Sequence, residues 1–192
     1  VSAAILAARG AKVIGIEISP ELVTQANSLW SEYADRLEFR VGDAENLDMA
    51  DEALDAIFFG GVLHHIPLLE EVYSESFRVL KPGGTFFAIE PNQLDVMERI
   101  EWAIADLRGK LTPNEYPINP WEAKKDLLNI GFNKINFWTT RSDIPFLAQF
   151  PILKWMFGRK KGFYIKKPIL RFINAFRAPS HRGNFIVLTA KK

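Results

Sequence analysis

Short apolar runs rich in β-branched residues recur along the chain, and segments with helical spacing of apolar residues separate them. The runs predict strands at residues 12–17, 37–41, 54–59, 85–90, 135–139 and 184–190. The segments between them predict helices at residues 1–9, about 19–35, about 68–80 and 119–131. Because strands that alternate with helices form a parallel sheet covered on both faces, the pattern predicts a doubly wound α/β fold.

Local signals mark the ends of several of these helices. Ser19, Pro20 and Glu21 combine an N-cap, a proline in the first turn and an acid near the helix start. Gly10 is a natural C-cap for the first helix, which is Ala-rich and expected to be buried. Residues 81–84 read Lys-Pro-Gly-Gly, a strong helix breaker that is expected to precede the strand at 85–90.

Two segments interrupt the alternation, at about residues 91–118 and 140–183. The first carries a helical pattern of Val96, Ile100, Ile104 and Leu107. In the second, residues 144–182 predict a substrate lid for an apolar or membrane-associated acceptor. A basic amphipathic stretch at 165–176 separately predicts contact with an anionic membrane, and the alternative is that these residues pack on the domain. Long loops in compact domains are usually functional, so both are treated as insertions in a single domain over residues 1–192.

Composition and charge narrow the classes of protein that fit. The chain has 192 residues, of which 48% are hydrophobic, and no cysteine, which excludes a disordered chain, thiol catalysis and a disulfide scaffold. No Asp or Glu follows Asp143, so an acidic body precedes a basic tail that favours an anionic surface or substrate. The sequence contains no known nucleic-acid readout module, so a nucleic-acid partner is not expected. It also shows no signal peptide and no apolar run long enough to span a membrane, so a cytoplasmic location is expected.

Two acids stand at the ends of successive predicted strands. Glu17 closes the strand at 12–17, and Asp43 follows the strand at 37–41 after a glycine. Ligands bind at the carboxyl ends of strands in open α/β sheets, so the pair predicts a nucleoside pocket. The alternatives are a solvated acid at Glu17 and an ordinary Asx turn at Asp43.

Glycines and histidines follow the strand at 54–59. Gly60 and Gly61 permit close approach of the backbone to a ligand. His64 and His65 are each either a general base or a hydrogen-bonded structural residue. Neither a third ligand nor an acid lies near them at metal-binding spacing, so no metal site is expected.

The segments 10–20, 42–47, 55–65 and 80–84, in this order and spacing, together resemble the class I S-adenosylmethionine-dependent methyltransferases. The likeness is to the small-molecule group related to the quinone-biosynthesis methyltransferases. It implies S-adenosylmethionine as cofactor and methyl transfer to an unidentified small-molecule or lipid-like acceptor. An oxygen nucleophile would also need a base, for which His64 or His65 is the nearest candidate. The resemblance also implies the cofactor-binding residues: Glu17 on the ribose hydroxyls, Ile18 on the adenine, Asp43 on the adenine amino group, Ala44 beside it, and Gly60 at the methionine end.

The resemblance further implies a Rossmann-like, mostly parallel sheet in the order 3-2-1-4-5-7-6, with a C-terminal antiparallel hairpin. The family's first strand and its glycine-rich loop have no counterpart here, because Val1 corresponds to the residue after that loop. The chain is therefore expected to be incomplete at its N-terminus. A non-catalytic cofactor-binding module and an NAD-dependent oxidoreductase are the alternative functions, the latter because an acid at this strand end also suits an NAD ribose.

Overall fold

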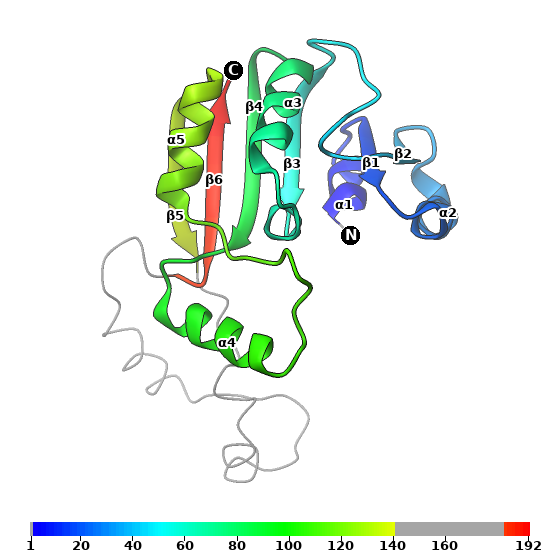
Figure 1. Cartoon of the computed structure of the whole chain (residues 1–192). Coiled ribbons are helices and arrows are strands. Elements are labelled where there is room, and N and C mark those ends of the chain that lie inside the picture. Colours follow the sequence, from blue (N-terminus) through cyan, green and yellow to red (C-terminus); the bar gives the residue numbers. More distant parts are fainter. Residues whose placement is uncertain (1, 141–182) are drawn as a thin grey trace, which may run out of the picture.

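A computed structural model describes residues 2–140 and 183–192 (Figure 1). The helices are α1 (Ser2–Ala8), α2 (Pro20–Leu29), α3 (Leu69–Val79), α4 (Val96–Leu107) and α5 (Pro120–Ile130), with 3₁₀ turns at Ser31–Tyr33 and Leu63–His65. The strands are β1 (Val13–Glu17), β2 (Leu37–Val41), β3 (Leu54–Gly60), β4 (Leu80–Pro91), β5 (Asn133–Thr140) and β6 (Phe185–Lys191). The predicted lid and the basic stretch at 165–176 lie outside the described residues.

The strands form two sheets, one with the order β1-β2 and one with the order β3-β4-β6-β5. β1 pairs with β2 and β3 with β4 in parallel, whereas β6 runs antiparallel to both of its neighbours. This confirms the mostly parallel sheet with an antiparallel hairpin at its C-terminal end. Within the described ranges no strand joins β1 to β3, which are the two strands expected to flank the family's first strand. That the chain is incomplete stays a prediction.

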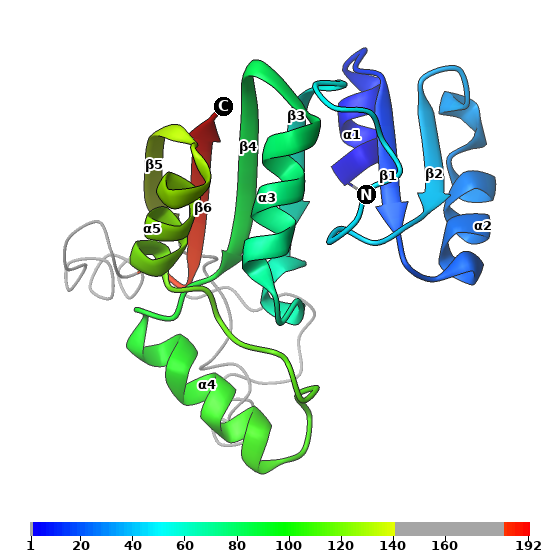
Figure 2. The same cartoon turned by 45° about the horizontal axis from the view of Figure 1, so that its top comes forward.

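The main core lies between the four-stranded sheet and the helices α3 and α5, which cover the same face (Figures 1 and 2). Tyr73 of α3, Phe86 of β4 and Phe132 before β5 are fully buried, and the rings of Tyr73 and Phe132 both meet Phe86 edge-on. A smaller cluster of Ala4, Ala7 and Leu37 joins α1 to β2. The core thus fixes β3 and β4, whose carboxyl ends carry the histidines and Glu90.

Three sequence predictions about these elements need correction. α1 is only half covered, because it packs on β1, β2 and the 3₁₀ turn at Ser31–Tyr33 and leaves Ile5 and Leu6 exposed. α2 ends at Leu29 instead of about residue 35, where the chain tightens into a 3₁₀ turn. β4 begins at Leu80, which pairs with Leu54, so residues 81–84 form an irregularity within the strand.

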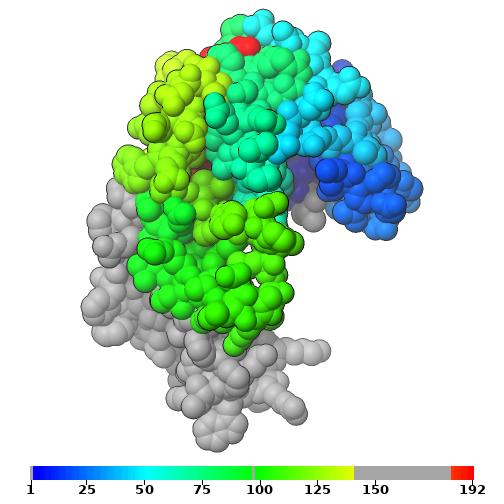
Figure 3. All heavy atoms as spheres, in the orientation of Figure 1, coloured from blue at the N-terminus to red at the C-terminus, as the bar shows by residue number. Residues whose placement is uncertain are grey.

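α4 lies across the carboxyl end of the four-stranded sheet, below β3 and β4 in the view of Figure 1. The helix predicted from the first insertion is therefore confirmed. Of the apolar positions that predict it, Val96, Ile100 and Leu107 are exposed, whereas Glu98 on another face is buried. The helix consequently presents polar side chains to the sheet end. Figure 3 shows the surface indented between α4 and the N-terminal segment.

Candidate active site

The carboxyl ends of β1, β2 and β3 point in the same direction (Figures 1 and 2). β1 and β2 pair in a register that sets Glu17 opposite Val41, and the backbone N–H of Gly42 donates to the Glu17 carbonyl at 3.1 Å. This brings Glu17 and Asp43 to one end of the sheet. Together with the residues that follow them, Ile18 and Ala44, they are called the acidic edge below.

Glu17 is half-buried and held by a local contact. Its Oε1 accepts a hydrogen bond from the N–H of Ser19 at 3.1 Å, while the Ser19 hydroxyl caps α2 by accepting from the N–H of Leu22. In the described part of the chain the second carboxylate oxygen of Glu17 has no protein partner. Ile18 is 71% exposed beside it. An open carboxylate next to an open apolar side chain is suited to bind a ring that carries hydroxyl groups.

Asp43 begins a tight turn. Its Oδ1 accepts from the N–H of Glu45 at 3.0 Å, and its carbonyl accepts from the N–H of Asn46 at 3.2 Å. The Asx turn that sequence analysis offered as the alternative is therefore present. It occupies one carboxylate oxygen and leaves the other without a partner among the described residues, while Ala44 packs on the main core.

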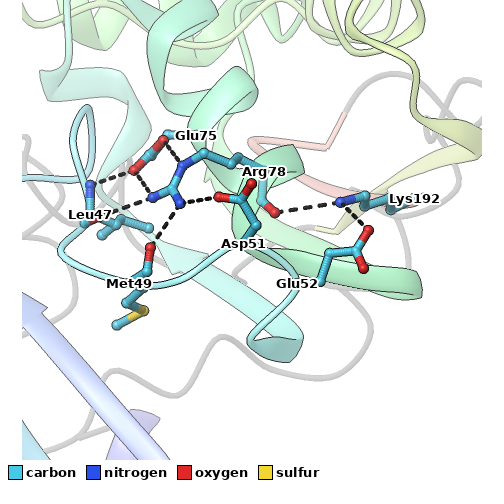
Figure 4. Close-up of polar contacts among 7 residues, drawn as sticks. All are labelled: Leu47, Met49, Asp51, Glu52, Glu75, Arg78 and Lys192. Atoms are coloured by element: carbon cyan, nitrogen blue, oxygen red, sulfur yellow. Dashed lines mark hydrogen bonds and ion pairs between the residues drawn. The ribbon is translucent and has the colours of Figure 1, made fainter.

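The loop that continues from this turn is fixed to α3, as Figure 4 shows. The N–H of Leu47 donates to Glu75 at 2.7 Å, and the guanidinium of Arg78 donates to the carbonyls of Leu47 and Met49. Arg78 also pairs with Asp51 and with Glu75, each at 2.6 Å. The hydrogen bonds from Arg78 lower the pKa of Glu75. Sequence analysis assigned no role to Glu75 or Arg78.

Gly60 ends β3, and a sharp turn follows it. Gly61 has a φ of +69°, a conformation that favours glycine, and its N–H donates to the carbonyl of Ile89 on β4. Gly60 is exposed, and a Cβ there would lie 2.9 Å from the ring of Phe58. The two glycines therefore keep backbone accessible at the end of β3.

His64 is held by a fully buried carboxylate from the neighbouring strand. Its Nδ1 lies 2.8 Å from Oε2 of Glu90, and Oε1 of Glu90 accepts from the N–H groups of Val62 and Leu63, both at 3.0 Å. The edge of Trp102 on α4 lies against the imidazole. This arrangement fixes the ring and favours the tautomer with a proton on Nδ1, which leaves Nε2 as an acceptor.

His65 is held less closely than His64. Its side chain is 48% exposed, its ring stacks near that of His64, and its Nδ1 lies 3.9 Å from Glu115. Acids that lie far from the histidines in sequence are brought to them by the fold, Glu90 by β4 and Glu115 by the loop before α5. Potential ligand atoms of His64, His65 and Glu115 lie within 4.8 Å of one another. Glu115 also accepts from the N–H and the hydroxyl of Thr112.

His64, His65, Glu90 and Trp102 are called the histidine cluster, and α4 borders it with further acids. Asp95 caps the helix by accepting from the N–H of Glu98, and Glu98 accepts from the indole N–H of Trp102 at 3.0 Å. Burial raises the pKa of Glu98 despite this hydrogen bond.

No helix in the described residues is long and apolar enough to cross a membrane.

Comparisons with known proteins point to one family. The family described as "Methyltransferase domain" matches residues 1–88. A sterol 24-C-methyltransferase of Yarrowia lipolytica is 31% identical over 138 residues, which cover 65% of this chain and 34% of that protein. A ubiquinone/menaquinone biosynthesis C-methyltransferase of Methylobacterium nodulans is 36% identical over 64 residues, 33% of this chain and 25% of that protein. The chain thus spans about a third or less of these relatives.

Solved structures share the fold at lower sequence identity. An S-adenosylmethionine-dependent methyltransferase from Thermotoga maritima superposes with a TM-score of 0.65 at 17% identity, covering 97% of this chain and 75% of that one. A phosphoethanolamine N-methyltransferase from Haemonchus contortus, in complex with S-adenosylhomocysteine, gives a TM-score of 0.63 at 18% identity over 95% of this chain and 44% of that one. At these identities the likeness establishes the Rossmann-like fold predicted from the sequence.

Proposed function

Since residues 1–88 of this chain belong to the methyltransferase domain family, we propose that the complete protein transfers a methyl group from S-adenosylmethionine to a small-molecule or lipid-like acceptor. The observation that carries the proposal is that the carboxyl ends of β1, β2 and β3 point in the same direction, with the acidic edge at the first two and the histidine cluster beside the third. The acidic edge contacts the main core through Ala44, and the candidate base follows β3, a strand of that core.

The residues of the acidic edge fit the adenosine part of the cofactor. The unpartnered oxygen of Glu17 would accept from the ribose hydroxyls, and the exposed Ile18 would cover the adenine. The free oxygen of Asp43 would accept from the adenine amino group beside Ala44, and Gly60 would line the methionine end. When bound, S-adenosylmethionine supplies an electrophilic methyl group on a positively charged sulfur.

His64 is the better candidate for the base. The buried carboxylate of Glu90 accepts a hydrogen bond from the protonated Nδ1, so the unprotonated Nε2 can take a proton from the nucleophilic atom of the acceptor. Glu90 would also stabilise the resulting imidazolium, in the way a carboxylate supports a catalytic histidine. The half-exposed His65 has its nearest carboxylate 3.9 Å away and is oriented less firmly.

The class of acceptor follows from the relatives. Proteins named as sterol and as ubiquinone/menaquinone methyltransferases support a lipid-like acceptor. Contact of residues 165–176 with an anionic membrane would suit such an acceptor and stays a prediction. The match to a methyltransferase family disfavours the NAD-dependent oxidoreductase, and a cofactor-binding module without catalysis is left as an outcome of the test.

Calorimetry on the complete protein tests this function, with S-adenosylhomocysteine as the unreactive probe. We expect binding to the wild-type protein, weaker binding to Glu17→Ala and Asp43→Ala, and no binding of NADH. Methyl transfer from labelled S-adenosylmethionine to sterol and quinone precursors is then measured. Unchanged affinity in both variants would overturn the assignment of the acidic edge. Binding without transfer to any acceptor would favour the non-catalytic module.

A further inference from the structure

We propose that Arg78 and Glu75 of α3 are positioning residues that set the place of Asp43 and Ala44, and thereby the affinity for the nucleoside. The inference rests on the proposed function. It concerns residues 42–53, the loop between β2 and β3, whose first turn carries Asp43. Neither residue belongs to the acidic edge or to the histidine cluster.

Arg78 uses its whole guanidinium on this loop and on Glu75. Nε donates to Glu75, Nη1 to the carbonyl of Met49 and the carboxylate of Asp51, and Nη2 to the carbonyl of Leu47 and to Glu75, at 2.6–3.1 Å. A guanidinium has five N–H donors in a rigid fork, so every donor has a partner here. Charge-assisted hydrogen bonds of this kind are stronger than neutral ones.

Arg78 and Glu75, called the clamp from here on, fix the position of the loop along α3 at Leu47. The N–H of Leu47 donates to Glu75 while its carbonyl accepts from Arg78, and its side chain is 7% exposed. Both backbone groups of Leu47, its N–H and its carbonyl, are therefore held by α3, as Figure 4 shows. A shift of the loop along α3 would break both hydrogen bonds and expose the Leu47 side chain.

The turn that carries Asp43 lies between two fixed points. Before it, Gly42 is bonded to Glu17 on β1, and after it Asn46, which bonds back to the Asp43 carbonyl, leads directly to Leu47. Three residues separate Asp43 from the clamped peptide. The orientation of the free Asp43 oxygen is consequently set by the fold and needs no ligand to order it, which reduces the entropy cost of binding.

The chemistry of the clamp requires arginine. Lysine at residue 78 would offer a single ammonium with three donors that cannot reach two carbonyls and two carboxylates in this planar arrangement. The carbonyls of Leu47 and Met49 would then lose partners. We therefore expect Arg78→Lys to weaken nucleoside binding almost as much as Arg78→Met does.

The test compares S-adenosylhomocysteine affinity with loop order in the complete protein. For Arg78→Met we expect the Kd to rise about tenfold, and hydrogen exchange in residues 43–50 to become faster. The KM for S-adenosylmethionine should rise while kcat changes less than twofold. Lys81→Met is the matched control, because it removes an exposed ion pair to Asp55 near the same end of α3 without touching the loop.

Glu75→Gln covers the case in which Arg78→Met fails to fold, because the amide keeps an acceptor for the N–H of Leu47 and loses the charge that pairs with Arg78. Faster exchange in residues 43–50 with a raised Kd in either folded variant, and neither in Lys81→Met, supports the proposal. An unchanged Kd in both Arg78→Met and Glu75→Gln overturns it. Absence of binding by the wild-type protein would instead contradict the proposed function.

Discussion

The carboxylates of the acidic edge and of the histidine cluster are used in opposite ways. Glu17 and Asp43 each accept one hydrogen bond from a residue two positions further along the chain and keep one oxygen open. Glu90 is fully buried and accepts from Val62 and Leu63 while pairing with His64. The acidic edge thus keeps carboxylate oxygens open, whereas the carboxylate of the histidine cluster holds one imidazole in place.

The largest expected effect is on catalysis at the histidine cluster. In Glu90→Gln the amide oxygen can accept from the two backbone N–H groups, and the NH₂ group then faces Nδ1 of His64. The imidazole must carry its proton on Nε2, so it cannot act as a base. We expect kcat to fall by about 10²- to 10⁴-fold, the range for loss of general base catalysis.

The measurement is the rate of methyl transfer at saturating substrates, together with S-adenosylhomocysteine affinity. His64→Gln should match Glu90→Gln in rate, and both should bind the probe as the wild-type protein does. A rate within threefold of wild type in both variants would show that His64 is not the base and that the histidine cluster is structural.

The second prediction separates the two regions by stability. Glu90→Ala removes the acceptor of two backbone N–H groups and of the imidazole, and it leaves buried donors unpaired. The free energy of unfolding should fall by about 3 kcal/mol or more, since each unpaired buried group costs about 1–3 kcal/mol. Urea unfolding measures it. Glu38→Ala is the control, because it breaks an exposed pair with Arg40 and should lower the free energy of unfolding far less.

At the acidic edge we expect a larger effect on ligand affinity than on the free energy of unfolding. Glu17→Ala should weaken S-adenosylhomocysteine binding by about 1–3 kcal/mol, which is the scale for a lost hydrogen-bonding partner. Its free energy of unfolding should change by less than about 1 kcal/mol, because only one local hydrogen bond to Ser19 is lost. Calorimetry and urea unfolding on the same variant check both. A loss of stability without a loss of affinity would remove the distinction between the two regions.

The position of the acidic edge could be predicted from the sequence, and so could His64 and His65, but the partners that hold these histidines could not. Residues 37–41 alternate apolar and charged side chains, as a strand does, and β2 spans those five residues, so the strand end and Asp43 after it were predictable. Glu90 and Glu75 act across 26 to 28 residues of sequence, on His64 and on Leu47. No local pattern marks such contacts, because strand pairing and helix packing create them only in the folded chain.

α4 shows the same limit at the level of one helix. The periodicity of its apolar residues predicts the helix correctly, yet Val96, Ile100 and Leu107 are exposed while Asp95 and Glu98 are buried. A period determines that one stripe is apolar and says nothing about which stripe faces the domain. The same helix places the ring of Trp102 against that of His64.

The smallest expected effect is a change in Tm on substitution of Glu98, which lies on α4 beside the histidine cluster. Burial raises the pKa of Glu98, so the folded protein binds a proton at this carboxyl more readily than the unfolded chain does. Ionised Glu98 therefore lowers stability at neutral pH. Gln at this position keeps an acceptor for the Trp102 indole and carries no charge. We expect Glu98→Gln to raise the Tm at pH 7.5 by about 1–3 °C.

The sign of this effect fixes its pH dependence. Below the pKa of a glutamate in the unfolded chain, about 4.3, both states are protonated and the advantage of Glu98→Gln should vanish. It should grow as the pH rises through the raised pKa of the folded protein and then stay constant. Glu21→Gln is the opposite control, because hydrogen bonds to the backbone and to Ser19 lower the pKa of Glu21, so its loss should lower the Tm at neutral pH. The measurement is the Tm of both variants and of the wild-type protein in thermal melts from pH 4 to 8. A gain for Glu98→Gln that is equal at every pH would mean that side-chain packing, and not the buried charge, accounts for it.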